Sequence, residues 1–159
     1  MIDSILLTNT VQLLKKKHLT LATAESCSGG LLAHSFTNIS GSSDYFDRGV
    51  VTYSNQAKKD LLHVKQITLE RYGAVSEQTA REMAEGIQSL SKVDIGISTT
   101  GIAGPDGGTQ EKPVGLVFIG LVFNDTSTVK RYIFSGTRLE NKDATVNAAL
   151  TLLQAVLQH

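Results

Sequence analysis

The sequence predicts an α/β fold in which a mixed β-sheet is flanked by helices within one layered domain, residues 1–159. Short runs rich in β-branched and aromatic residues alternate with longer segments whose apolar residues recur every three or four positions. No linker, repeat or low-complexity segment interrupts this order. Because 159 residues is also near the usual size of one domain, we expect a single hydrophobic core.

The first half of the chain is predicted to contain two strands and several helices. Apolar spacing and three lysines in the last turn predict the first helix. β-branched and aromatic residues predict the second strand, after which Ser54 or Asn55 is placed to cap a helix. The expected elements are helix Ser4–Lys17, strand Leu19–Ala24, a helix from Leu31, strand Phe46–Tyr53, a helix carrying Ala57–Val64, a short helix Leu69–Tyr72 and helix Ser76–Leu90.

The second half is predicted to contain three more strands and a closing helix. A mostly apolar run, Val93–Ser98, is typical of a buried strand, and the glycine-rich segment Thr99–Gly108 after it is expected to form a loop. Two further strands, Val114–Phe123 and Val129–Phe134, are expected to form a hairpin that turns at Asn124–Thr126. Helical spacing of apolar residues predicts a last helix from about Lys142 to Leu157.

Composition and charge exclude several classes of protein. The net charge is +0 and the longest basic run, Lys15–Lys17, fits the solvated end of a helix, so we expect no nucleic-acid partner. One cysteine rules out an internal disulfide and a cysteine-only metal site, and it suits a reducing compartment. No apolar stretch approaches a membrane span, and the first residues do not resemble a secretory signal. We therefore expect a cytoplasmic protein with no membrane contact.

Glycine, hydroxyl and other polar residues concentrate in three segments that follow predicted strands. These are Thr23–Gly30, Tyr53–Lys58 and Thr99–Gly108. Open α/β sheets bind their ligands at the carboxyl ends of strands. If the three ends are adjacent in the sheet, they build one pocket.

Ser26 is a candidate nucleophile, because it lies in the turn between a predicted strand and a predicted helix. Backbone N–H groups at such a turn can face a developing oxyanion, and Gly29 and Gly30 would let a substrate approach closely. Two alternatives stay open. Ser26 or Ser28 can be an ordinary helix cap, and Cys27 can be the nucleophile, because a helix N-terminus lowers a thiol pKa.

A serine nucleophile needs a base. None of the four histidines lies in a glycine-rich turn or at a strand end: His18, His34, His63 and His159. Lys58 is the next candidate, since a buried amine can lose its proton near neutral pH and its place in the first turn of a helix disfavours the charged form. The competing interpretation is a solvated helix lysine.

Two features suggest phosphate binding. The loop Gly101–Gly108 has the composition of a phosphate-binding nest, but it lacks the Gly-x-x-x-x-Gly-Lys-Ser/Thr pattern of nucleoside-triphosphate hydrolases. Arg138 follows a short polar turn and carries a forked set of donors that suits a phosphate; a surface ion pair is the equal alternative.

Five ordered motifs span nearly the whole chain: Thr23–Gly30, Gly41–Ser43, Arg48–Asn55 with Lys58, Gly73–Ser76, and Gly101–Gly108 with Lys112–Gly115. Together they resemble the family of CinA C-terminal domains, which includes stand-alone nicotinamide-mononucleotide deamidases. The resemblance implies hydrolysis of the carboxamide of nicotinamide mononucleotide, giving nicotinate mononucleotide and ammonia, with no metal and no cofactor. It also implies a homo-oligomer.

The resemblance assigns roles to individual residues. By position, Ser26 matches the nucleophile and Lys58 the general base, while Ser43, Tyr53 and Thr100 match pocket or supporting residues. The same holds for Arg138, which we expect to hold the ribose phosphate together with the glycine-rich loop. The competence-related family name keeps a second function open, a non-catalytic module that binds a nucleotide or a protein.

The oxyanion would be held by backbone donors. We expect them in the turn formed by Ser28, Gly29 and Gly30, or at the strand end formed by Thr100 and Gly101. Both places put N–H groups near the predicted nucleophile, and neither is favoured by the sequence.

Overall fold

A five-stranded mixed sheet forms the middle layer of the protein, in the order β2-β1-β3-β4-β5. The computed structural model describes residues 1–159. Strands β1 (Leu21–Glu25), β2 (Phe46–Val51) and β3 (Ile95–Gly101) are parallel, whereas β4 (Leu116–Phe123) is antiparallel to β3 and β5 (Thr126–Ile133) is antiparallel to β4. The predicted α/β fold with a mixed sheet is confirmed.

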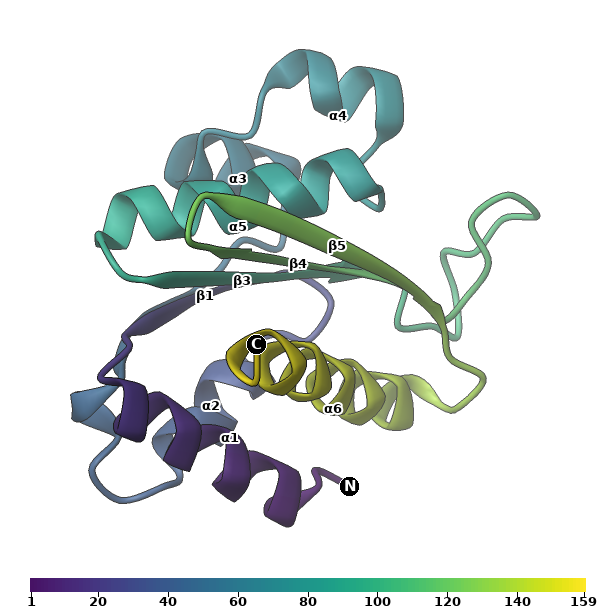
Figure 1. Cartoon of the computed structure of the whole chain (residues 1–159). Coiled ribbons are helices and arrows are strands. Elements are labelled where there is room, and N and C mark those ends of the chain that lie inside the picture. The colour runs from purple at the N-terminus through teal and green to yellow at the C-terminus, as the bar shows by residue number, and fades with distance from the viewer.

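Helices cover both faces of this sheet, as Figure 1 shows. Helices α1, α2 and α6 lie on one face, and α3, α4 and α5 lie on the other. The larger hydrophobic core, with 19 buried residues against 7, lies on the α1–α2–α6 side, so most apolar burial supports that layer. No helix combines the length and the apolar character needed to cross a bilayer. The helices are α1 (Ser4–Lys17), α2 (Leu31–Thr37), α3 (Asn55–Leu62), α4 (Gln66–Tyr72), α5 (Glu77–Ser91) and α6 (Arg138–Leu157), with a 3₁₀ turn, η1, at Ser42–Asp44.

The register of the three parallel strands brings their carboxyl ends to one edge. Glu25 at the end of β1 is paired with Val51 of β2 and with Thr99 of β3. The residues that follow, including Ser26 and Thr52, therefore start from the same edge. Parallel strands need crossover connections, and here the crossovers α2 and α3–α5 begin at this edge.

Three predicted boundaries differ from the structure, two of them in the second half of the chain. Strand β3 continues through Gly101, so the glycine-rich loop begins at Ile102 rather than at Thr99. The hairpin turn consists of Asn124 and Asp125, both at positive φ, which lets β5 begin at Thr126. Earlier in the chain, α4 begins at Gln66 and not at Leu69.

Helix α6 begins at Arg138, four residues before the predicted start. The Thr137 hydroxyl accepts a hydrogen bond from the Glu140 backbone N–H, and the Glu140 carboxyl accepts one from the Thr137 backbone N–H. This reciprocal arrangement is a capping box, which satisfies two backbone donors that a helix start otherwise leaves free. It places Arg138 in the first turn of the helix.

We predict that Thr137→Ala lowers the free energy of unfolding by about 1 kcal/mol, because one backbone donor at the start of α6 loses its acceptor. Urea denaturation measures the change. The control is Thr8→Ala, at an exposed position inside α1, where alanine does not lower stability because it is the better helix former. Equal midpoints for the two variants would contradict the role of the cap.

Candidate active site

The side chains of Ser26 and Lys58 meet at the carboxyl edge of the sheet. The amine nitrogen of Lys58 lies 3.1 Å from the Ser26 hydroxyl oxygen, across 32 residues of sequence. Ser26 retains 8% of its surface exposed and Lys58 retains 1%, so solvent reaches the pair from the serine side. The two predicted catalytic side chains are thus within hydrogen-bond distance.

The position of Lys58 follows from the way α3 begins. Ser54 caps the helix by accepting a hydrogen bond from the Ala57 backbone N–H, as predicted for this segment. Lys58 and Leu62, one turn apart, are the buried residues of α3 and point toward the protein interior. The solvated-lysine interpretation is therefore wrong, because the amine lies under the helix and not on its surface.

Three oxygen atoms surround the Lys58 amine. Besides Ser26, the amine contacts the backbone carbonyls of Thr52 and Tyr53, at 2.9 and 3.3 Å. A neutral amine has two N–H donors and one lone pair. An ammonium would donate to all three oxygens. The neutral amine that attack by serine requires would keep its two N–H groups on the carbonyls and turn its lone pair to the hydroxyl hydrogen of Ser26.

Burial lowers the pKa of Lys58, because desolvation disfavours the charged form. No carboxylate pairs with this amine in an ion pair that would oppose the effect. The lowered pKa favours the uncharged base that attack by serine requires, and the 3.1 Å contact places that base beside the hydroxyl.

The turn after Ser26 presents free backbone donors. The backbone N–H groups of Cys27, Ser28 and Gly30 donate to no protein acceptor. Gly29 and Gly30 have φ values of 60° and 99°, a backbone conformation that favours glycine. Of the two predicted places for oxyanion donors, this turn therefore offers unpartnered N–H groups directly after the candidate nucleophile.

A buried glutamate, which sequence reasoning did not single out, holds this turn in place. The Glu25 carboxyl accepts hydrogen bonds from the Ser28 hydroxyl and from the backbone N–H groups of Leu32 and Ala33, at 2.6, 2.8 and 3.0 Å. Its side chain is fully buried. Since the first N–H groups of a helix have no partner within the helix, Glu25 supplies the acceptors that α2 lacks.

The Ser28 hydroxyl is fully used within this network. It donates to Glu25, and the Thr99 hydroxyl, 2.7 Å away, is then the donor to Ser28. Ser28 has no exposed surface, so its side chain serves to hold the turn. Likewise, the Thr100 hydroxyl donates to the carbonyl of Ala74, so it joins the loop before α5 to the end of β3.

Cys27 is a poor nucleophile. Its side chain is buried, and burial raises its pKa to about 12. The thiolate, which is the reactive form, is then almost absent near neutral pH. This argues against a thiol-dependent site, although Cys27 lies next to Ser26 in the turn.

Arg138 and Tyr53 meet at the rim of the site. The Arg138 guanidinium donates to the Tyr53 hydroxyl at 3.1 Å and to the carbonyl of Gly104 at 2.7 Å. Tyr53 is 61% exposed. Arg138 forms no ion pair, so the alternative of a surface ion pair is wrong. Gly101, whose backbone was a predicted donor, is paired with Val117 of β4 as the last residue of β3.

Ser43 lies away from the other predicted site residues. It belongs to η1, which precedes β2, and the register pairs the start of β2 with the start of β1. The length of β1, five residues at about 3.3 Å each, separates it from Ser26 by roughly 16 Å. The prediction that Ser43 joins this pocket is therefore wrong within one chain, because the strand direction places it at the opposite edge.

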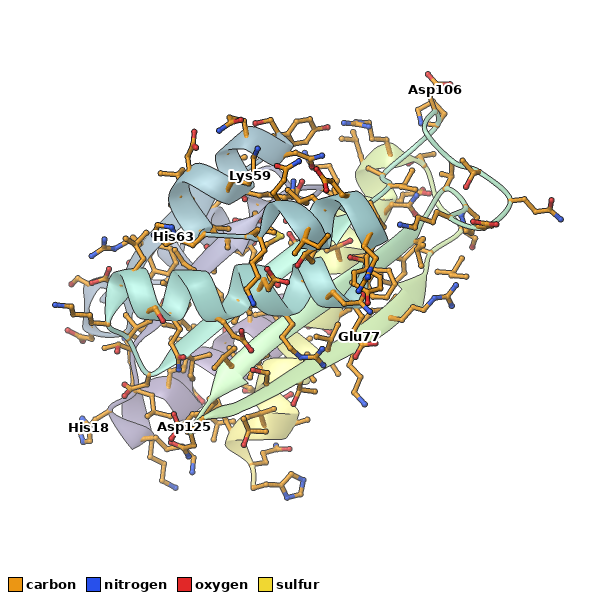
Figure 2. All side chains as sticks on the ribbon, turned by 90° about the horizontal axis from the view of Figure 1, so that it is seen from above. His18, Lys59, His63, Glu77, Asp106 and Asp125 are labelled. Atoms are coloured by element: carbon orange, nitrogen blue, oxygen red, sulfur yellow. The ribbon has the colours of Figure 1, made fainter.

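The histidines are not at the site. His18 and His63 occupy left-handed positions that end α1 and α3. Figure 2 shows His18 at the end of the molecule opposite to Asp106 in the glycine-rich loop. No histidine side chain forms a hydrogen bond with Ser26, and no group of three or more His, Cys, Asp or Glu side chains is arranged to hold a metal ion.

Comparison with known proteins identifies the family of the chain. Residues 4–157 match the CinA C-terminal domain. The chain belongs to this family. This CinA domain is 53% identical over 147 residues to a competence-damage inducible protein of Thermoanaerobacter pseudethanolicus, covering 92% of the chain but only 36% of that relative. A competence-damage inducible protein of Clostridium botulinum is 52% identical over 146 residues, with the same coverage.

Solved structures share the whole fold of this CinA domain. The competence/damage inducible protein CihA of Agrobacterium tumefaciens superposes with a TM-score of 0.95 at 40% identity, covering 100% of this chain and 99% of that one. The competence damage-inducible protein A of Klebsiella pneumoniae gives a TM-score of 0.94 at 36% identity, covering 98% and 96%. The chain thus spans about a third of the curated relatives and nearly all of these solved chains.

We predict that Glu25→Gln destabilises this CinA domain by about 2–3 kcal/mol. The amide NH₂ would replace one carboxyl oxygen that accepts a backbone N–H, which leaves a buried donor unsatisfied. Urea denaturation measures the loss. The matched control is Glu111→Gln, in the exposed loop after β3, for which we expect no measurable change. An unchanged midpoint for Glu25→Gln would show that the network does not hold the turn.

Proposed function

We propose that this CinA domain is an amidohydrolase that converts nicotinamide mononucleotide into nicotinate mononucleotide and ammonia with a Ser26–Lys58 pair. The observation that carries the proposal is the 3.1 Å contact between the Lys58 amine and the Ser26 hydroxyl, buried with no carboxylate partner. The choice of substrate rests on the resemblance of the motifs to the deamidases. The chain covers about a third of its curated relatives, so the proposal concerns this domain alone.

The first step is attack by serine. Neutral Lys58 takes the proton of the Ser26 hydroxyl, and the serine oxygen bonds to the carboxamide carbon of the substrate. The C=O electron pair moves to the oxygen, which becomes an oxyanion. Desolvation of the amine is what makes it available as a base near neutral pH, since an exposed lysine has a pKa of about 10.4.

The oxyanion is expected to bind the free N–H groups of the turn. Among the backbone donors without an acceptor, Cys27 follows the nucleophile directly and Gly30 is the more exposed, at the end of the same turn. One such donor contributes about 3 kcal/mol to stabilisation of the transition state. The network of Glu25 keeps these donors fixed before the substrate arrives, so no reorganisation is needed during the reaction.

The second half of the cycle releases first ammonia and then nicotinate mononucleotide. Protonated Lys58 gives its proton to the departing nitrogen as the C–N bond breaks, which leaves an acyl ester on Ser26. Lys58, neutral again, takes a proton from a water molecule that attacks the ester. The ester bond breaks, the serine oxygen recovers its proton from Lys58, and nicotinate mononucleotide leaves.

A binding module without catalysis is the competing function, and one assay separates the two. The purified chain is incubated with nicotinamide mononucleotide, and ammonia is measured. A pure binder releases none, whereas the proposed enzyme turns over repeatedly. A thiol-dependent hydrolase would lose activity in Cys27→Ala, but the serine mechanism predicts that this variant stays active.

We predict that Ser26→Ala and Lys58→Met each reduce ammonia release at least ~10²-fold, since one removes the nucleophile and the other the base. Lys58→Met is also expected to keep or increase the free energy of unfolding, because it removes the cost of burying an amine. Lys59→Met, at a neighbouring lysine that donates to Gln66, is the matched control and should keep normal turnover. Near-normal activity of Lys58→Met would refute the assignment of the base.

The lowered pKa of Lys58 predicts the pH dependence. Only the neutral amine is active, so kcat/KM should rise with pH and level off above an apparent pKa lower than that of an exposed lysine. Between the lowered folded pKa and the ordinary unfolded pKa, the unfolded chain binds more protons, so this group's contribution to stability also rises with pH. A pH series of initial rates and melting curves, compared with Lys58→Met for stability, tests both. A flat or falling rate profile would contradict a lysine base.

A further inference from the structure

A second basic residue of α6 reaches the turn that follows Ser26. Lys142 lies four residues after Arg138, so the two side chains project from the same face of α6, about 6 Å apart along its axis. The Lys142 amine nitrogen lies 3.4 Å from the position that a Cβ on Gly29 would occupy. The Lys142 amine thus lies against the turn that follows Ser26. The predicted start of the last helix, at about Lys142, gave no indication of this contact.

No protein anion neutralises this amine. Lys142 forms no ion pair and donates no hydrogen bond to another residue, although it is only partly exposed. Its neighbour Asp143 pairs instead with the N-terminal amine of Met1, at 2.7 Å. A half-buried cation usually has a partner, so the charge of Lys142 is available for a ligand.

Arg138 adds a second available cation on the same face. Two of its five N–H donors are used by Tyr53 and by Gly104, and both acceptors are uncharged. The remaining donors and the whole charge stay free. Together, Arg138 and Lys142 place two unneutralised positive charges one helical turn apart beside Gly29 and Tyr53.

We propose that Lys142 is a specificity-determining residue that binds the phosphate monoester of the substrate together with Arg138. This inference rests on the proposed function and adds Lys142 to the residues that recognise the phosphate of the substrate. A phosphate monoester has a charge of about −1.5 to −2 at pH 7, which two cations match. A single oxyanion needs less charge, and it has the backbone donors of the turn.

The test compares two substrates that differ only in the phosphate. For Lys142→Met, we expect KM for nicotinamide mononucleotide to rise about 10- to 100-fold with kcat within twofold, because a charge-assisted contact is lost before chemistry. For nicotinamide riboside, which lacks the phosphate, kcat/KM of this variant should equal that of the unsubstituted protein. Lys142→Arg should restore most of the affinity, and Lys17→Met, an exposed lysine at the opposite edge, should change nothing.

Two results would overturn the inference. If Lys142→Met lowered kcat equally for both substrates, Lys142 would stabilise the oxyanion and not bind the phosphate. If KM for the nucleotide were unchanged in this variant, Lys142 would not contact the substrate. Folding of each variant is checked by its melting curve without ligand.

A binding measurement separates this inference from the proposed function. Ribose 5-phosphate is titrated against the unsubstituted protein, Lys142→Met and Lys17→Met, and the melting temperature is followed. Stabilisation that is lost only in Lys142→Met supports the phosphate site, even if no variant releases ammonia and the amidohydrolase proposal fails. Equal stabilisation of all three proteins, or of none, would overturn the phosphate site whatever the catalytic result.

Discussion

The site depends on an amine that is buried without a negative charge beside it. Removing an ammonium group from water is costly, and a carboxylate partner would keep it charged. Lys58 instead contacts two backbone carbonyls and one hydroxyl. Those groups satisfy the hydrogen-bonding needs of a neutral amine but compensate poorly for a full positive charge. The chemistry proposed for Ser26 follows from these surroundings: burial without a carboxylate lowers the pKa of the amine, and the 3.1 Å contact holds the amine beside the hydroxyl.

The rest of the fold serves to bring these groups to one edge. Three parallel strands end in register, which sets the Ser26 turn beside the carbonyls that follow β2. The antiparallel hairpin β4–β5 adds no catalytic group, but it returns the chain to the same edge, where the capping box starts α6. Figure 1 shows α6 beginning beside the loop between β3 and β4. The last helix can therefore both close the larger core and present Arg138 at the site.

Sequence reasoning predicted the fold class and the central pair but not the supporting residues. Ser26 and Lys58 follow strands, and parallel strands bring their carboxyl ends together, so their meeting was foreseeable. Ser43 was misplaced because a motif does not say at which end of its strand it lies. Glu25 was missed since a carboxylate that caps a helix from a preceding strand has no fixed spacing. For Lys142 a signal did exist: Thr137-x-x-Glu140 is a capping box, and it would have started the helix early enough to align Lys142 with Arg138.

Tyr53 contacts both Lys58 and Arg138, one through its backbone and the other through its side chain. Its backbone carbonyl accepts a hydrogen bond from the Lys58 amine, and its hydroxyl accepts one from Arg138. The side chain is largely exposed, so packing does not hold it and these polar contacts determine its position. A ligand anion that draws the Arg138 guanidinium would act on the same residue that positions the base. Only the cap residue Ser54 stands between Tyr53 and the first residue of α3, so Tyr53 and Lys58 are close in sequence as well as in space. Tyr53 therefore contacts both the arginine expected to bind the anionic end of a substrate and the amine expected to act as base.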